Sequence, residues 1–410
     1  MTSLLGLRVQ NFGTIGDVRL GQVGPGRGKP LRGLVCLIGP HNSGKSTLLD
    51  VFRFLADCLM EGVETACNKP HRGGYDRIHN AEANGPMSFQ LYYREWKGAK
   101  PITYELVIDT RNGRPVIASE TLLQRRRGSD NGPPRPFAFL ELSNGIGKVW
   151  PGEAPENAEA EVEEDANGVD VNLANLTQLG IMTFGRLKEY PRISRLQRFI
   201  EAWYQFDFVP EAARSLPPAG AQPHLDRTCA NLANYARFIS DKYPRVHETI
   251  VDELTVNVPH LWLMGNWETL DKRQLLHFHE GREDDPSFPS HMSDGTLKLL
   301  AYLLLFKDPK PRSLMCIDLP ESHIYPLFLF SLVEKFREYM DRGGQLFIST
   351  HSPTLVNALL PDEVFCISKE WGINRIRRVA DNPKVMTFVK AGETLGSLWQ
   401  RGLLGGSIYQ

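Results

Sequence analysis

The stretch GPHNSGKST at residues 39–47 constrains the fold more than any other part of the chain. It fits the pattern G-x-x-x-x-G-K-[ST], the apolar run GLVCLIGP at 33–40 leads into it, and the helix-periodic segment STLLDVFRFLADCL at 46–59 follows it. A buried strand, a glycine loop and a helix in this order turn backbone amide groups and the positive end of the helix toward a phosphate. The sequence therefore predicts a phosphate-binding loop at the start of an α/β domain.

The residue types in this loop predict how a nucleoside triphosphate is held. In such loops the lysine, here Lys45, reaches the β- and γ-phosphates, and the next hydroxyl, on Ser46, coordinates Mg²⁺. The other residues expected to contact the nucleotide are Gly39, Asn42, Ser43, Gly44 and Thr47. A chance match in a glycine-containing turn is the alternative, and the flanking strand and helix disfavour it. We expect ATP and Mg²⁺ as cofactors.

Composition limits the partners that such a domain can have. The 410 residues carry 47 Lys plus Arg against 48 Asp plus Glu, so no overall charge favours nucleic acid or membranes. The six cysteines form no Cys-x-x-Cys pair, and we expect buried free thiols in a reducing compartment. The longest apolar stretch, residues 299–306, is too short to span a bilayer, and the first residues lack a signal-peptide pattern. These features predict a cytoplasmic protein without a membrane segment.

The order of patterns divides the chain into three expected ranges. Residues 1–150 are expected to form an ATP-binding lobe with the phosphate loop, and short alternating runs from 86 to 150 predict antiparallel strands. Residues 151–285 begin with an acidic loop at 151–170 and continue as a mainly helical insertion. Residues 286–410 alternate helix and strand patterns, as a parallel sheet requires. The predicted fold class is α/β, with a parallel sheet, an antiparallel β subdomain and a helical insertion.

A further pattern lies in HMSDGTLKLL at 291–300, where a serine and a glycine open an apolar helix. Ser293 and the Gly295 amide would lie at the positive end of that helix and face an anion. An ordinary N-cap by Ser293 or Asp294 before a core helix is the alternative. Placed before an acidic strand, the segment resembles the signature motif of ABC-type ATPases. That resemblance implies that both residues approach the γ-phosphate held by another subunit.

Two strand ends complete this order of motifs. The apolar run MCID at 315–318 ends in Asp318, which can organise Mg²⁺ through water. The segment QLFISTHSP at 345–353 places His351 after a strand and a threonine, where ABC-type enzymes have the switch histidine that touches the γ-phosphate. This resemblance makes His351 a candidate catalytic residue, and it makes Ser46 and Asp318 the candidate magnesium ligands.

Nearly the whole chain resembles the RecF, SMC and OLD-like branch of ABC ATPases, which are also described as AAA-type ATPases. The resemblance begins at LLGLRVQNFGTIGDVRL (4–20), includes HRGGYDRI (71–78), ends at LGSLWQRGLLGG (395–406), and is thin between 130 and 285. It implies an ATP-binding ABC-type head that forms a homodimer around ATP, alone or within a larger assembly. It also implies work on DNA ends, in RecF-type repair, or beside a nuclease or other effector subunit in bacterial antiviral defence.

One departure from the family pattern puts ATP hydrolysis in question. After the acidic strand the family has acid, acid, Pro, Glu, whereas this chain has DLPE at 318–321. Leu319 therefore replaces the carboxylate that normally polarises the attacking water, and leucine cannot act as a general base. Glu321 reaches the same water if the loop bends inward; otherwise it is a surface or packing glutamate. We keep Glu321 as a candidate catalytic residue and expect any hydrolysis to ADP and phosphate to be slow.

Two functions fit these motifs. In the first, the protein is a dimeric ATPase whose hydrolysis resets a nucleotide-gated sensor or clamp that acts with DNA or a partner effector. In the second, it is an ATP-bound scaffold that holds a nuclease or other effector with negligible turnover. Both are switches set by nucleotide binding, and the sequence leaves the choice between them open.

Basic residues supply weaker signals. Arg72, before Gly73 and Gly74, is a candidate for a flexible lid over the nucleotide or for a basic turn on the surface. The clusters QRRRG at 124–128 and NRIRR at 374–378 are candidate contacts for nucleic-acid phosphates, or solvated faces. His, Cys and carboxylate residues do not occur at metal-ligand spacing and there is no nucleophile elbow, so any nuclease centre is expected on a partner.

Overall fold

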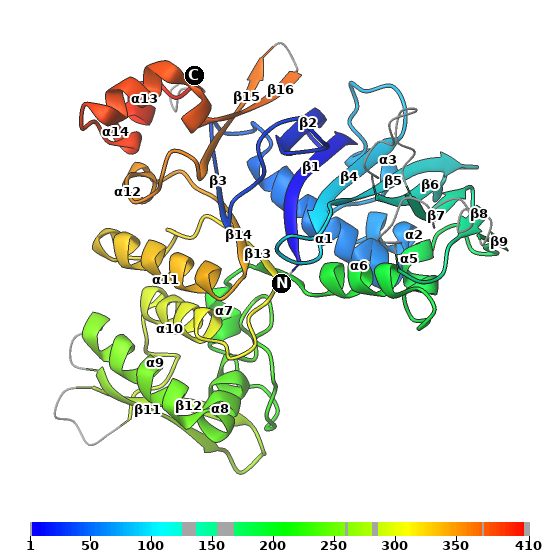
Figure 1. Cartoon of the computed structure of the whole chain (residues 1–410). Coiled ribbons are helices and arrows are strands. Elements are labelled where there is room, and N and C mark those ends of the chain that lie inside the picture. The colour runs from blue at the N-terminus through cyan, green and yellow to red at the C-terminus, as the bar shows by residue number, and fades with distance from the viewer. Residues whose placement is uncertain are drawn as a thin grey trace. The chain divides into compact units, whose positions relative to one another are not determined.

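The computed structural model describes residues 2–124, 137–153, 168–258, 261–280, 286–370 and 373–405. The chain forms two compact units, Met1–Trp203 with Leu360–Gln410, and Tyr204–Leu359 (Figure 1). Most of the predicted acidic loop at 151–170, and the arginines of the QRRRG cluster at 124–128, lie outside the described residues.

A large antiparallel sheet dominates the first unit, with the strand order β2-β1-β4-β5-β6-β7-β8-β9. Two of its turns are Asn-Gly pairs, at 112–113 and 144–145, in which both residues have positive φ. Such pairs match the twist of a hairpin and set its register. The antiparallel strands predicted for 86–150 are therefore confirmed, and the first two strands and β9 extend the sheet. The strands are β1 (Ser3–Phe12), β2 (Ile15–Gly21), β4 (Met87–Arg94), β5 (Ile102–Arg111), β6 (Arg114–Gln124), β7 (Phe137–Ser143), β8 (Ile146–Val149) and β9 (Val169–Asn172).

The strand and helix around the phosphate loop also belong to the first unit. β3 (Leu34–Ile38) is fully buried and runs parallel to β15 (Val364–Glu370), which pairs antiparallel with β16 (Ile373–Arg378). A strand buried on both faces is a continuous apolar run, as in β3. After the loop, α1 (Lys45–Glu61) packs through the Phe54 ring, whose centroid lies 5.0 Å from that of Phe12 on β1 and 5.4 Å from that of Phe89 on β4. The other helices are α2 (Val63–Cys67), α3 (Tyr75–Ile78), α5 (Gly180–Phe184), α6 (Pro191–Glu201), α13 (Pro383–Lys390), α14 (Leu395–Gln400) and the short η4 (Val379–Asp381).

The second unit contains the helix and strand alternation predicted for the later motifs. α10 (Asp294–Phe306) is buried at every position from Leu297 to Phe306, and apart from Lys298 this leucine-rich stretch is apolar on all sides. β13 (Leu314–Asp318) and β14 (Gln345–Ser349) pair in parallel, with α11 (Leu329–Asp341) as the crossover between them. The remaining elements before and after this core are β10 (Trp203–Phe206), α7 (Pro210–Ala213), α8 (Leu232–Lys242), α9 (Pro244–Asn257), η3 (Pro326–Phe328) and α12 (Pro353–Asn357).

The insertion is not helical throughout. β11 (Leu261–Glu268) and β12 (Gln274–Glu280) form an antiparallel hairpin next to α8 and α9. The sequence showed no clear alternation here, because Gln274, Leu276, His277 and Phe278 are all buried and the strand does not expose every second residue. None of the described helices has the length and apolar character needed to cross a membrane.

Candidate nucleotide-binding site

The phosphate loop leaves β3 through backbone conformations that only glycine adopts easily. Gly39 has a φ of +148°, and a Cβ on it would lie 2.1 Å from the Ile367 carbonyl oxygen of β15. Gly44, directly before α1, has a φ of +101°, and Asn42 between them has a φ of +59°. These left-handed residues curl the loop around the first turn of the 17-residue helix α1. The loop therefore has the backbone of an anion-binding turn.

Two buried side chains line this loop. Lys45 is 5% exposed, and its ammonium donates hydrogen bonds to the carbonyl oxygens of Gly39 at 3.0 Å and Pro40 at 2.8 Å. The buried Ser43 hydroxyl has no hydrogen-bond partner among the described residues. A buried cation together with an orphaned hydroxyl fits a phosphate group, because phosphate oxygens accept hydrogen bonds from both. The donor set therefore suits a bound triphosphate.

The loop is anchored by residues that lie far away in sequence. Asn374 on β16 donates from Nδ2 to the Ser43 carbonyl at 3.0 Å and accepts at Oδ1 from the Gly16 amide at 3.3 Å. Thr47 Oγ1 lies 3.1 Å from Thr14 Oγ1 in the turn between β1 and β2. Sequence reasoning missed Asn374 as an anchor because it stands in the NRIRR cluster and carries no motif of its own. Ser46, by contrast, is exposed at the first turn of α1, where a metal ligand is accessible.

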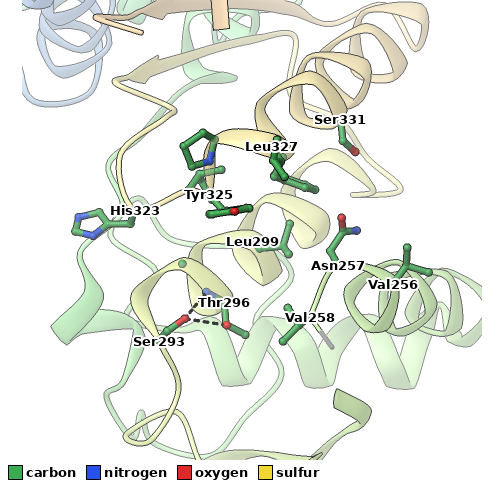
Figure 2. A pocket seen from close by; sticks show the side chains of 14 residues that line it. Val256, Asn257, Val258, Ser293, Thr296, Leu299, His323, Tyr325, Leu327 and Ser331 are labelled. Carbon is green, nitrogen blue, oxygen red and sulfur yellow. Dashed lines mark hydrogen bonds between the residues drawn. The ribbon is translucent and has the colours of Figure 1, made fainter. Parts of the chain in front are cut away.

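In the second unit, Ser293 caps the helix that the signature-like segment opens. Its Oγ accepts a hydrogen bond from the Thr296 amide at 3.1 Å and lies 2.9 Å from Thr296 Oγ1 (Figure 2). Gly295 is needed for packing, since a Cβ there would lie 2.6 Å from the His323 carbonyl oxygen. Ser293 therefore caps α10 in the ordinary way, and it remains exposed at the positive end of that helix.

A cavity of about 820 Å³ lies beside this helix end, entirely within the second unit. Figure 2 shows Ser293 and Thr296 on one side of it and Tyr325 and Leu327 on the other. Tyr325 is 71% exposed and Leu327 is 78% exposed, which is unusual for large apolar side chains. The signature-like end of α10 is therefore bordered by an apolar surface.

Strand β13 ends at Asp318, and the chain takes an unusual backbone conformation at the next residue, Leu319, where the family has its second acid. The Asp318 carboxylate accepts a hydrogen bond from the hydroxyl of Ser349, at the end of the neighbouring strand β14. The next residue, Leu319, has a φ of +49°, and its amide donates to the Ser349 carbonyl at 3.0 Å. A leucine in the left-handed region is strained, so the chain turns sharply directly after Asp318.

That turn brings two sequence-predicted residues together. Glu321 Oε1 accepts a hydrogen bond from the backbone amide of His351 at 2.7 Å. Glu321 Oε2 is buried and has no hydrogen-bond partner among the described residues. Glu321 is therefore held against the backbone that follows β14 and is not a solvated surface side chain. His351 contributes its backbone to this contact, and its side chain is half-buried.

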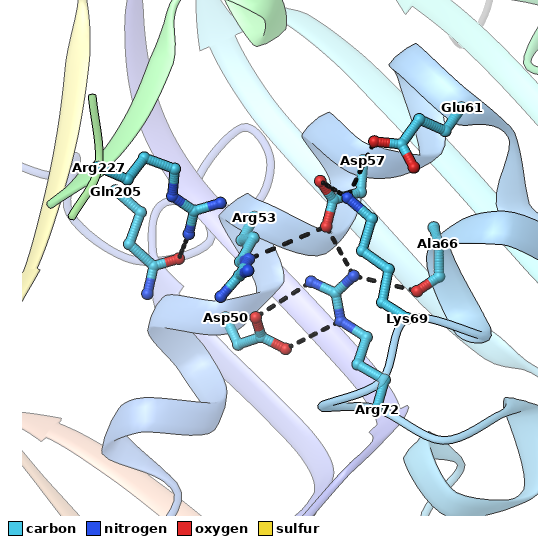
Figure 3. Close-up of polar contacts among 9 residues, drawn as sticks. All are labelled: Asp50, Arg53, Asp57, Glu61, Ala66, Lys69, Arg72, Gln205 and Arg227. Carbon is cyan, nitrogen blue, oxygen red and sulfur yellow. Dashed lines mark hydrogen bonds and ion pairs between the residues drawn. The ribbon is translucent and has the colours of Figure 1, made fainter. Parts of the chain in front are cut away.

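Neither interpretation of Arg72 made from the sequence is correct. Its side chain is 2% exposed and forms ion pairs with Asp57 at 2.7 Å and Asp50 at 3.1 Å, both on α1 (Figure 3). It also donates to the Ala66 carbonyl at 3.0 Å, while Lys69 bonds to Asp57 at 2.7 Å. Burial acts to raise the pKa of Asp57, but the hydrogen bonds from Lys69 and Arg72 lower it below its ordinary value. Arg72 is thus a buried clamp on α1 and neither a lid nor a surface turn.

The NRIRR cluster divides between two environments. Arg378 is 8% exposed, donates to the Pro30 carbonyl at 2.9 Å, and lies over the Phe365 ring at 5.0 Å. Arg375 and Arg377 are exposed and line a shallow depression of about 350 Å³ together with Arg19. Only part of this cluster is therefore available to a phosphate backbone.

Comparison with known proteins places this geometry in context. Residues 34–357 match the family model described as "AAA domain, putative AbiEii toxin, Type IV TA system". No curated protein matches the chain. Two Smc heads are among the solved structures that are similar in fold. One is an Smc head bound to the C-winged helix domain of ScpA, with 12% identity, 91% of this chain and 97% of that chain covered, and a TM-score of 0.53. The other is the Smc head domain with an extended coiled coil from Pyrococcus furiosus, bound to the C-terminal domain of ScpA, with 11% identity, coverage of 95% and 100%, and a TM-score of 0.50.

Proposed function

Because the chain belongs to the AAA-domain family of the AbiEii type and has the head fold of ABC-type ATPases, we propose that it is a slow, nucleotide-gated ATPase switch. In this proposal it binds ATP with Mg²⁺ in the phosphate loop, pairs with a second copy around the nucleotide, and hydrolyses ATP through Glu321.

The phosphate loop supports nucleotide binding through its own residues. Lys45 now bonds to two loop carbonyls, and a triphosphate would offer its ammonium stronger, charged acceptors. The amide groups of Gly39–Thr47 and the free Ser43 hydroxyl would complete the cradle. Ser46 and Asp318 are the residues that would hold Mg²⁺, which, when bound, neutralises phosphate charge.

A single observation supports hydrolysis, namely the state of the Glu321 carboxylate. One oxygen is held by the His351 amide, while the other is buried without a hydrogen-bond partner among the described residues. A carboxylate fixed in this way can accept a proton from a water molecule at Oε2, which is the task that Leu319 cannot perform. We therefore assign the role of general base to Glu321 and a positioning role to the backbone of His351.

Phosphate release under saturating ATP and Mg²⁺ tests this assignment in wild type, Lys45→Ala, Glu321→Gln and Leu319→Glu. We expect Lys45→Ala to lose ATP binding, and Glu321→Gln to keep binding while its turnover falls by about 10²-fold, the usual range for losing a general base. Leu319→Glu, which restores the usual second acid, is expected to raise turnover. Equal turnover in wild type and Glu321→Gln would instead favour the second candidate, an ATP-bound scaffold with negligible hydrolysis, which Leu319 itself supports.

The family description and the sequence resemblance together support a role in bacterial antiviral defence. The model that the chain matches is described as "AAA domain, putative AbiEii toxin, Type IV TA system". The resemblance to the RecF, SMC and OLD-like branch of ABC ATPases implies a subunit that acts beside a nuclease. We propose a cytoplasmic protein with a separate effector or nuclease partner. Nucleic acid would meet the exposed arginines at positions 19, 375 and 377. Co-purification of the chain with the products of neighbouring genes, with and without ATP, would test this role.

A further inference from the structure

Helix α10 carries a buried lysine in the signature-like segment 291–300, at a position to which the sequence assigned no role. Lys298 is 3% exposed, and its ammonium donates hydrogen bonds to the Ser322 carbonyl and Ser322 Oγ, both at 2.8 Å, and to the Leu319 carbonyl at 3.4 Å. It also lies 6.0 Å and 5.5 Å from the ring centroids of Phe208 and Tyr302. Burying an ammonium is costly unless such bonds compensate, so its place under this loop is specific.

Two neighbours on the same face of α10 hold the same loop. The Tyr302 hydroxyl donates to the Pro320 carbonyl at 3.0 Å. The His323 carbonyl oxygen packs closely against Gly295, because a Cβ at this position would lie only 2.6 Å from it. Residues three and four positions apart share one helix face, so Gly295, Lys298 and Tyr302 form a continuous row along the loop.

The loop needs this support because it is strained on both sides of Glu321. Leu319 has a φ of +49° and His323 a φ of +61°, and neither residue is a glycine. Such conformations persist only where surrounding contacts hold them. On its other side the loop is held by the bond between Glu321 and the His351 amide. Glu321 is therefore fixed between the row on α10 and the end of β14.

An electrostatic link accompanies these contacts. Burial lowers the pKa of Lys298 to about 8, and the Glu321 carboxylate acts against that shift, together with Cys229 and Asp207. Lys298 therefore interacts electrostatically with the Glu321 carboxylate and also forms hydrogen bonds to the backbone of the loop.

We propose that Lys298 is a positioning residue for Glu321, holding residues 319–322 so that Glu321 Oε2 stays in the orientation that accepts a proton from water. The inference rests on the proposed function, because it assumes that Glu321 is the base. Since Ser293 caps α10, the same row connects the end of the helix expected to meet a second copy with the loop that carries Glu321. Contact of Ser293 with a second copy and proton transfer at Glu321 are therefore coupled through α10.

The test compares Lys298→Met with Lys298→Arg in the full-length protein. Methionine keeps much of the stem and removes the charge and all three hydrogen bonds, whereas arginine keeps a cation that can donate to the same oxygens. We expect Lys298→Met to lower the single-turnover rate of ATP hydrolysis at least tenfold while the Kd for ATP changes less than twofold. Lys298→Arg is expected to recover part of the rate.

A matched control and a milder variant separate positioning from general destabilisation. Lys335→Met removes another lysine of the same unit, one that pairs with Glu253 and Glu338, and it should leave the rate unchanged. If Lys298→Met does not fold, Tyr302→Phe removes only the bond to the Pro320 carbonyl and should still lower the rate several-fold.

The double variant Lys298→Met, Glu321→Gln decides whether Lys298 acts through Glu321. A positioning role predicts that the double variant is no slower than Glu321→Gln alone, because the group being positioned is gone. The inference would be overturned if the rate losses of the two single variants multiply in the double variant, or if the rate of Lys298→Met equals that of wild type. Either result would leave the role of Glu321 intact. A Glu321→Gln rate equal to that of wild type would overturn the proposed function itself.

Discussion

At the scale of single residues, two carboxyl groups depart from what their positions in sequence suggest. Glu321 stands two residues after the position where the family places its second acid, yet its Oε2 is buried without a hydrogen-bond partner among the described residues. Glu120 on β6 has no motif, and it is fully buried with hydrogen bonds from the Tyr104 hydroxyl and from the amides of Gly180 and Ile181. The local environment, and not the residue type, decides what each of these acids does.

Glu120 should make stability depend on pH. Burial raises its pKa from 4.5 to about 7, although the bonds from Ile181, Gly180 and Tyr104 oppose the shift. The folded form therefore keeps a proton that the unfolded form releases above its ordinary pKa. This contribution to stability is fully present below pH 4.5 and is lost as pH rises to about 7, by about 3 kcal/mol.

Unfolding by urea at pH 5 and at pH 8 would measure this effect. We expect the free energy of unfolding to fall less between the two pH values in Glu120→Gln than in wild type, since glutamine does not titrate. Glu141→Gln, at an exposed position on β7, should keep the wild-type difference. The same pH dependence in all three proteins would show that Glu120 titrates normally.

At the scale of elements, α1 shows how one helix is held at its first turn and along its length. Its first turn belongs to the phosphate loop, and its middle is clamped by Arg72 through Asp50 and Asp57 (Figure 3). The Arg72 guanidinium also lies 5.1 Å from the centroid of the Phe54 ring, which packs α1 on the large sheet. The segment HRGGYDRI is therefore a support for the helix that carries the loop.

Replacing Arg72 should cost stability and should affect ATP binding only secondarily. Arg72→Met removes the partner of Asp50 and breaks a buried ion pair. We expect the free energy of unfolding to fall by about 3 kcal/mol. Arg53→Met, whose guanidinium lies 4.0 Å from Asp57 and is more exposed, should cost less than about 1 kcal/mol. Urea unfolding measures both values. Wild-type stability combined with a large loss of ATP affinity in Arg72→Met would restore the lid interpretation.

At the scale of the whole molecule, the exposed end of α10 suggests how two copies meet. Ser293 lies there, across the cavity from the exposed side chains of Tyr325 and Leu327 (Figure 2). An exposed apolar surface of this kind is typical of a surface that another protein covers. A dimer formed around ATP would cover this surface in the proposed switch.

Mass measurement by light scattering tests that dimer. With ATP and Mg²⁺ we expect Glu321→Gln to be dimeric, because slow hydrolysis preserves the closed state, and Glu321→Gln with Ser293→Arg to be monomeric. Ser143→Arg, at the exposed end of β7 in the large sheet, is the matched control and should still dimerise. A dimer that persists in Ser293→Arg, or that forms equally without ATP, would contradict the proposed interface.

The sequence alone determined the phosphate loop, the helix cap and the tight hairpin turns, because their conformation depends on residues close together in the chain. The order of β3, the glycine loop and α1, the Ser293 cap of α10, and the Asn-Gly hairpins follow from φ preferences and periodicity within about ten residues. For the same reason the positions of the phosphate loop and of the later motifs along the chain could be predicted.

Only the tertiary structure decided which of the remaining candidates have a role. The Glu321 carboxylate meets the His351 amide across 30 residues, and Lys298 meets Ser322 across 24. From the sequence, Arg72 was a candidate for a flexible lid or for a basic turn on the surface. In the structure it is enclosed by packing and pairs with two aspartates of α1. Such contacts depend on how separate segments pack, and packing is set by the burial and hydrogen bonding of the whole unit, which no short stretch of sequence encodes.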